Sequence, residues 1–473
     1  MGLIREVTNG IKAAVGYQQQ FEELLANSDV TRALYLMEDR SVQAAENLNT
    51  YKIGTHKVME RKDRAVYDSK GNFLRWSKRW KLPVSFPEYI NEISLVFLYG
   101  RPVKWSQLSE NTDEAFDNFV KTNDDVRFNA LVRECKRHAG AEGVSAIVYH
   151  LYQQDGKPQL LLKVLSKEDD DDIYTIKDQY GRLRAAGWGY TLTDTGGKSV
   201  YHIDIDTGTH IYRCKRGNLG WEVKEEVNPV GKILYLLFEQ DPESGVVQPL
   251  IERYEDLSSV DADVNDRFSN PAMVATAEVL NSLPKQEEEA KLFILKNGGK
   301  MEYLTWNQAS QSKENEYARL EKHILSKSFT PDINFENMKS LGNLSAKAIM
   351  KIFLLATIKA EKHKERHDGY MSRHANLMRA ILGNVLDYKH KSQYEALRIG
   401  HEFQQPFGDD VSDVLKDALT QHGQGALSTE SLLEISYLVK NVSREMERLQ
   451  QEQAEALERQ QEMNRQDAFG PTD

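Results

Sequence analysis

The most constraining feature of this chain is a pair of helix-length segments that each carry only one thin apolar stripe. Gln248–Phe268 has apolar residues at spacings of three and four, which predicts a helix of roughly 30 Å. Gln308–Ser328 has a similar length and fewer apolar residues. The mixed insert Ser269–Asn307 separates them, so the three segments predict a helical hairpin with a capped tip. Because neither stripe can fill a core alone, we expect a neighbouring copy of the hairpin to cover it.

The rest of the chain predicts a mainly α, α+β fold. The first hundred residues are expected to be mostly helical, with a polar linker at Ser69–Asn72. From Ala146 to about Leu237, short β-branched and aromatic runs alternate with Asp-Gly, Gly-Gly and Thr-Gly turns. That spacing predicts an antiparallel β-meander or small barrel. The C-terminal third is predicted to be helical, with Ser428 opening one helix and a highly charged helix at Val442–Met463.

A short break and a very long helix lie between these parts. The break is Phe329–Leu344, and Ser345 is a suitable N-cap for the helix that follows. The apolar stripe predicts about 40 helical residues, with Gly369 as the expected position of a kink.

Composition narrows the function classes. The 473 residues carry a formal net charge of −11, which argues against a module that grips nucleic acid through a basic patch. Two cysteines cannot form a disulfide scaffold and suit a reducing compartment. The start, MGLIREVTNG, has no apolar core of the secretory kind, and no stretch of about 18 uncharged apolar residues occurs. We therefore expect neither a secreted nor a membrane-spanning protein.

One histidine row could carry catalysis. His363, His367 and His374 fall on one helical face, which leaves a metal-dependent hydrolase as an alternative. A zinc protease needs Glu directly after the first His, and here Lys364 stands there. A hydrogen-bonded or interface row is the preferred interpretation.

Three other motifs favour structural roles. The acidic run Glu168–Asp172 is interpreted as a solvated loop rather than a cation site, and Asp206-Thr207-Gly208 as a turn. The basic-aromatic run Arg75–Lys81 could contact nucleic acid or a partner but is interpreted as a surface turn. The sequence thus predicts no catalytic residue, no metal and no cofactor.

A family resemblance appears in Leu320–Leu355. Its residues follow, in order, a motif of the portal proteins (head-to-tail connectors) of tailed bacteriophages, especially the branch from long-tailed phages of Gram-positive bacteria. The matching residues are Thr330, Pro331, Asp332, Phe335, Asn337, Gly342, Asn343 and Ser345. The chain departs from the motif at Ala346 and Ile349. The elements at 98–103 and 423–448 resemble the family more weakly.

The resemblance implies a portal fold assembled as a dodecameric ring around a channel for double-stranded DNA. Its parts would be a wing (1–247), a first stem helix (248–268), a clip (269–307), a second stem helix (308–328), a tunnel loop (329–344), a long wing helix with its return (345–403), a crown (404–463) and a disordered tail (464–473). The ring would sit at one vertex of the virion capsid, after assembly in the host cytoplasm.

The resemblance also implies the partners and the DNA-facing residues. The partners are the large terminase subunit, a head-completion or tail-adaptor protein, and the major capsid and scaffolding proteins, with no membrane. The residues expected near passing DNA are Asn337, Lys339, Asn343, Lys347 and Lys351. Salt bridges between subunits are the alternative role for these lysines. The rival functions are the hydrolase and a minor capsid or scaffolding protein without a channel.

Overall fold

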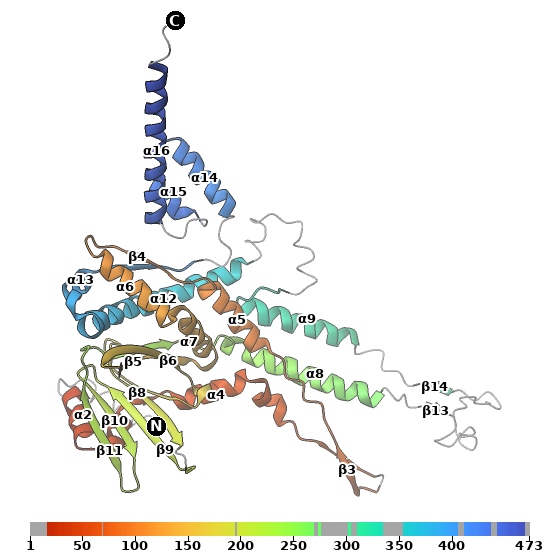
Figure 1. Ribbon diagram of the computed structural model, residues 1–473. Helices are drawn as coiled ribbons and strands as arrows, with labels where there is room; N and C mark the ends of the chain where they lie inside the picture. The colour runs from red at the N-terminus through yellow and green to blue at the C-terminus, as the bar shows by residue number, and fades with distance from the viewer. Residues whose placement is uncertain are drawn as a thin grey trace. The chain divides into compact units, whose positions relative to one another are not determined.

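The computed structural model describes residues 17–68, 70–193, 196–268, 273–275, 301–303, 310–333, 353–404, 411–436 and 442–468 (Figure 1). The described residues up to Gln404 form one compact unit, and those from Val411 onward form a second. Helices dominate and every sheet is antiparallel, which confirms the mainly α, α+β class. In the described part of the chain, no helix combines the length and the apolar character needed to cross a membrane.

The predicted β-rich unit is confirmed, but it consists of two sheets rather than one meander. The first has the strand order β12-β5-β6 and the second the order β1-β7-β8-β9-β10-β11. The strands are β1 Glu38–Asp39, β5 Val144–Gln154, β6 Lys157–Leu165, β7 Asp172–Lys177, β8 Leu183–Thr193, β9 Ser199–Asp206, β10 His210–Arg216, β11 Trp221–Val227 and β12 Tyr235–Glu239.

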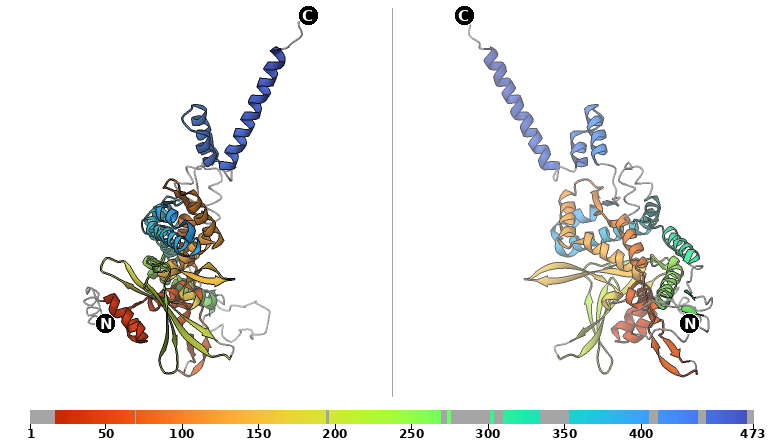
Figure 2. Two further views of the ribbon diagram at one scale, coloured as in Figure 1. Left: turned by 60° about the vertical axis from the view of Figure 1, so that its left-hand side comes forward. Right: turned by 90° about the vertical axis from the view of Figure 1, so that its right-hand side faces the viewer.

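Alternation along β5 separates two cores of the first unit. Ile147 and Tyr149 join the core built with the helices, whereas Ala146 and Val148 join the core shared with the second sheet. The helices on the first side are α5 Phe86–Tyr99, α6 Asp113–Asp125, α7 Phe128–Glu142 and α12 Leu354–Ile381. A third core packs the second sheet against α2 Tyr17–Ala26 and α3 Val30–Leu36 (Figures 1 and 2). Helices therefore flank a pair of stacked sheets.

The expectation of mostly helix before residue 100 is wrong at one place. After α4 Ser41–Tyr51, η1 Ile53–Thr55 and η2 Lys57–Glu60, the chain forms a hairpin from β2 Arg64–Tyr67 and β3 Phe73–Ser77. The expected linker is its turn, because the Asp68 carboxylate accepts the backbone N–H groups of Lys70 and Asn72 at 2.8 Å each. The apolar rings of this hairpin are exposed, so no burial periodicity marks its strands.

The described part of the long helix, α12, begins at Leu354, and the predicted N-cap Ser345 lies outside the described residues. Helical structure continues through Gly369, and the expected kink there stays a prediction. The irregular turn comes later, as a π-helical segment at Leu382–Leu386. Gly383 lies in it, and a Cβ at that position would sit 3.2 Å from the Cβ of Tyr394. Close packing against α13 Lys391–Ala396 thus accounts for the glycine.

The second unit consists of α14 Val411–Gly423, α15 Thr429–Ile435 and α16 Val442–Ala468. The predicted N-cap of α15 is confirmed, because the Ser428 hydroxyl accepts the Ser431 N–H at 3.1 Å. The expected disordered tail from Asn464 is corrected in part: α16 continues to Ala468 through Arg and Gln residues, which are good helix formers.

Candidate functional site

The helical hairpin is confirmed as α8 Gln248–Phe268 and α9 Ser310–Lys327, which lie side by side and antiparallel (Figure 1). Short strands β13 Met273–Ala275 and β14 Met301–Tyr303 pair within the insert. Away from the base of the hairpin, the two helices share polar contacts around Asp261. Lys313 Nζ lies 2.6 Å and the Tyr317 hydroxyl 2.8 Å from the Asp261 carboxylate. Val260 on α8 stays 45% exposed. That a neighbouring copy of the hairpin covers this exposed surface stays a prediction.

The base of the hairpin is anchored in the first unit. Ile251 of α8 and Ile324 of α9 are fully buried against Ile90 of α5. Beside them, Glu255 of α8 accepts from His56 Nδ1 at 2.6 Å and from the backbone N–H of Val84 at 2.8 Å. Burial disfavours a charged imidazole, but the hydrogen bond and charge of Glu255 raise the pKa of His56 above its ordinary value. The hairpin is therefore held by apolar packing and by the buried hydrogen bond between His56 and Glu255.

The motif residues Thr330, Pro331 and Asp332 form the exit from α9. Phe329 takes a left-handed conformation with φ 57°, and the Thr330 N–H bonds back to the Leu325 carbonyl at 2.9 Å, which completes a Schellman cap. Thr330 is buried. The Tyr89 hydroxyl of α5 then donates to the Pro331 carbonyl at 2.7 Å and accepts the Ile333 N–H at 3.1 Å. The chain therefore leaves α9 in one fixed direction.

The chain re-enters the described structure on the same helix. Phe353, just before α12, is buried with its ring centroid 5.7 Å from that of Phe97. Phe97 follows Tyr89 by eight positions on α5, roughly 12 Å along the helix axis. One helix thus holds both ends of residues 334–352.

Tyr89→Phe tests this attachment. We expect a loss of about 1–2 kcal/mol of local stability, because the Pro331 carbonyl and the Ile333 N–H lose their partly buried hydrogen-bond partner. Limited proteolysis should then cleave faster between residues 330 and 353. Tyr35→Phe, at a side chain that is 81% exposed, is the matched control and should leave the cleavage rate unchanged. Equal rates in both variants would contradict the anchoring role.

A buried charge cluster joins α5, α7 and α12 beside this attachment. The Glu243 carboxylate lies 2.5 Å from Lys136 Nζ of α7, 2.6 Å from Lys359 Nζ of α12 and 3.2 Å from His363 Nε2, and it accepts from the Ser94 hydroxyl of α5 at 3.0 Å. Burial by itself raises the pKa of a carboxyl. Here the nearby cations, Lys136 foremost, hold the pKa of Glu243 well below its usual range. The Glu243 carboxylate at the centre of the cluster therefore stays charged at neutral pH.

The histidine row does not form a metal site. His363 contacts Glu243, His367 Nδ1 lies 2.8 Å from the Tyr99 hydroxyl, and His374 binds the Tyr149 hydroxyl and the Asn123 side chain at 2.7 and 2.9 Å. Three imidazoles with three separate sets of partners confirm the hydrogen-bonded row. In the described ranges, one cluster of three potential metal ligands has its atoms within 4.8 Å of one another, and it contains none of these histidines.

Two other motifs are structural. Asp206 accepts from the Gly208 N–H, the Leu234 N–H and the Asn228 amide at 2.7–3.0 Å, which confirms the turn. The acidic run is not simply a solvated loop, because Asp171 is buried and accepts from Trp188 Nε1 at 2.6 Å.

The predicted DNA-facing residues and part of the motif cannot be placed. Asn337, Lys339, Gly342, Asn343, Ser345, Lys347 and Lys351 lie outside the described residues. Sequence reasoning missed the residues that hold the two ends of this segment, Tyr89 and Phe97, and the buried Glu243. Tyr89 and Phe97 both lie in the largely apolar run Tyr89–Tyr99, and that run was the available signal.

Comparison with known proteins gives a family. The model of the phage portal protein family described as SPP1 Gp6-like matches residues 37–459. A chain from the neck of a native GTA particle, computed with C12 symmetry, is 11% identical, with 74% of this chain and 89% of that chain covered and a TM-score of 0.41. A chain from the neck of an empty GTA particle, computed with C6 symmetry, is 11% identical, with coverages of 74% and 88% and a TM-score of 0.38.

None of the curated proteins compared with this chain matches it. The family match nevertheless spans most of the chain, including both ends of the segment that α5 holds. Members of that family are structural, non-enzymatic phage components with a portal or connector role. This protein therefore belongs to the SPP1 Gp6-like family of phage portal proteins.

Proposed function

We propose that this chain assembles as a dodecameric ring at one capsid vertex and forms the channel through which double-stranded DNA is packaged and ejected. The observation that carries the proposal is the attachment of residues 334–352 at both ends to α5, through Tyr89 and Phe97. A segment held at two points on a rigid helix can project into a channel without displacing the fold. Family membership supports the same role.

The structural parts are proposed to match those of a portal. α8 and α9 form the stem, the insert 269–307 the clip, and 329–344 the tunnel loop. Residues 1–247 form the wing, 345–403 its long helix and return, and 404–463 the crown. The thin apolar stripes of the stem are explained if each hairpin packs on its neighbour in a closed ring.

The acidic charge of the chain fits a channel that lets DNA slide. A protein that neutralises many phosphates with Lys and Arg binds DNA tightly and releases counterions. A net charge of −11 per copy opposes such binding. Three lysines in and just after the tunnel loop, Lys339, Lys347 and Lys351, would then make short-lived contacts with the backbone of the DNA.

The proposed partners follow from this position in the particle. The clip would dock the large terminase subunit, which supplies ATP hydrolysis, and later a head-completion or adaptor protein. The wing and crown would contact the major capsid and scaffolding proteins during assembly in the host cytoplasm. We also propose membership of the branch from long-tailed phages of Gram-positive bacteria, on the motif residues Thr330–Asp332.

Negative-stain imaging of the purified full-length protein tests the assembly. We expect rings with a central hole. Compact monomers, or closed particles without a hole, would overturn the proposal and favour a minor capsid or scaffolding role.

Lys339→Glu tests the tunnel-loop assignment. Reversing this charge is expected to impair DNA packaging while leaving ring assembly intact, because a carboxylate repels the phosphates that the lysine would contact. Packaged DNA protected from nuclease is the readout, and imaging reports the ring. Lys70→Glu, at an exposed position of the β2–β3 turn, is the matched control and should package normally. Normal packaging by the Lys339 variant would overturn the assignment of Lys339 to the DNA channel.

A further inference from the structure

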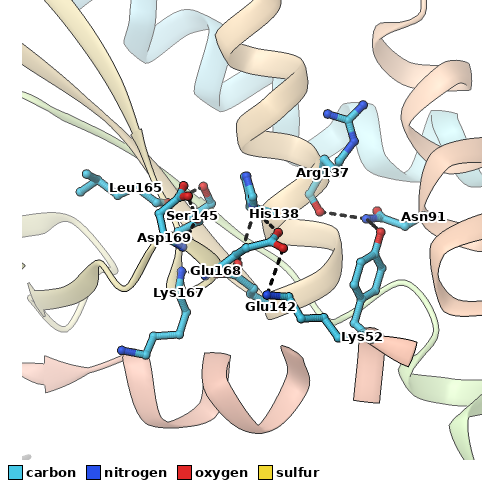
Figure 3. A network of polar contacts seen from close by, with 12 residues as sticks. Lys52, Asn91, Arg137, His138, Glu142, Ser145, Leu165, Lys167, Glu168 and Asp169 are labelled. Carbon is cyan, nitrogen blue, oxygen red and sulfur yellow. Dashed lines mark hydrogen bonds and ion pairs between the residues drawn. The ribbon is translucent and has the colours of Figure 1, made fainter. Parts of the chain in front are cut away.

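Three side chains with metal-ligating atoms converge where the helices of the first unit meet its sheets. His138 and Glu142 stand four residues apart on α7, so they share one face of that helix. Glu168 comes from η3 Lys167–Asp169, the turn between β6 and β7. Figure 3 shows the imidazole and the two carboxylates facing one another. The fold thus brings together the acidic run and a histidine 30 positions earlier in the chain.

The distances between the imidazole nitrogen and the carboxylate oxygens fit ligands of one shared cation better than hydrogen bonds between these side chains. His138 Nδ1 lies 3.4 Å from Glu142 Oε1 and 3.6 Å from Glu168 Oε2. A charged N–H to carboxylate hydrogen bond is shorter, about 2.7–2.9 Å. Ligands at about 2.0–2.2 Å from a tetrahedral zinc ion stand about 3.3–3.6 Å apart. Both distances from His138 Nδ1 to the carboxylate oxygens fall in that range.

The surroundings hold both carboxylates of the cluster in place, and Glu142 Oε1 itself accepts the Glu168 N–H. The Glu142 side chain is fully buried, and its oxygens accept the backbone N–H groups of Lys167 and Glu168 at 2.7 and 3.1 Å. Among the described residues, no lysine or arginine pairs with it. Lys52 Nζ lies 3.1 Å from Oε1 of Glu168, while Oε2 faces His138. A buried carboxylate held by backbone amides is a fixed ligand of the kind that metal sites use.

We propose that His138 Nδ1, Glu142 Oε1 and Glu168 Oε2 bind a divalent transition metal of the zinc class, with water completing the tetrahedron. An imidazole nitrogen with two carboxylates suits zinc, whereas calcium and magnesium prefer oxygen ligands throughout. The site is structural: it clamps the C-terminal end of α7 to the turn that joins the two sheets. It departs from the expectation of no metal, and the overlooked signal is the His-x-x-x-Glu spacing at 138–142.

Zinc titration of the full-length protein tests the site. The chain is stripped with a chelator and titrated with ZnCl₂ in a calorimeter, and the bound metal is counted by elemental analysis. We expect one zinc per chain, with affinity reduced more than about 100-fold in His138→Ala and in Glu168→Gln, since each loses a direct ligand. Asp170→Asn is the matched control, because it makes the same chemical change on the same exposed turn, and it should bind like the unmodified chain.

Each alternative interpretation of the cluster predicts a different result in this titration. Absence of stoichiometric zinc in the unmodified chain would mean that His138 is simply an ion-pair partner of the two carboxylates. Equal losses in the Glu168 and Asp170 variants would mean diffuse binding to the acidic run, and unchanged affinity in Glu168→Gln would also overturn the site. Glu168 is 43% exposed at its side chain, so its variant is expected to fold, as a melting curve in chelator would verify. None of these outcomes depends on ring formation.

Discussion

Replacing Glu243 by alanine is expected to destabilise the first unit by about 3–5 kcal/mol, because it strips two lysines of their carboxylate partner. Lys136 has no exposed side-chain surface and Lys359 is 13% exposed, so water cannot replace the lost charge. The free energy of unfolding from urea titration, followed by circular dichroism, measures the effect. Because the pKa of Glu243 is held below its usual range, its contribution is present at neutral pH and is lost as the pH falls through the pKa of the folded state.

Two further variants isolate the cause of this loss. Asp241→Asn removes a carboxylate from the same loop at an exposed position and should change stability by less than about 0.5 kcal/mol. Combining Glu243→Ala with Lys136→Met should recover part of the loss, since the second change removes a buried lysine charge that the first leaves without its carboxylate partner. A Glu243→Ala protein as stable as the Asp241 variant would show that the cluster is not stabilising.

Acidification below about pH 6.5 is expected to destabilise the first unit strongly, through His374. This imidazole is completely buried, stacks on Phe128 with centroids 3.4 Å apart, and uses both nitrogens in hydrogen bonds to Tyr149 and Asn123. Burial therefore holds its pKa well below the ordinary value near 6.5. The unfolded chain binds a proton there while the folded chain does not, so stability falls as the pH drops below 6.5.

His374→Gln measures this contribution. The variant should be less stable than the unmodified chain at pH 7, because it loses the stacking. The difference between their melting temperatures should narrow from pH 7 to pH 5, because glutamine does not titrate. His323→Gln, at an exposed position of α9, should follow the unmodified chain throughout. A difference in melting temperature between the His374 variant and the unmodified chain that stays constant from pH 7 to pH 5 would contradict the burial of a neutral imidazole.

The parts that sequence alone predicted are those with a regular burial pattern. The strands from β5 to β11 alternate or carry β-branched runs between glycine turns, and α8 has a thin but continuous apolar stripe. The β2–β3 hairpin was missed because its faces are both largely exposed, with Trp76 at 64% and Leu74 at 60%. Without a buried face, a strand has no period for sequence analysis to detect.

Only the part of the site that lies within one short stretch of sequence was predictable. The Thr330-Pro331-Asp332 motif lies within one short segment, and its position at the end of α9 agrees with the expected break. The contact of Tyr89 with Pro331 spans 242 positions, and that of Lys136 with Glu243 spans 107. These contacts depend on how α5, α7 and α12 pack together. No local sequence pattern specifies that packing.

The attachment of residues 334–352 to α5 also determines how their length can change. The two anchors, Tyr89 and Phe97, stand about 12 Å apart along the axis of α5, and residues inserted between the attached ends as a flexible loop would add loop-closure entropy. That entropy grows with the logarithm of loop length, and doubling the loop would cost about 0.6 kcal/mol. Related chains could therefore lengthen or shorten this segment freely in evolution, while the helices that carry it keep the same packing.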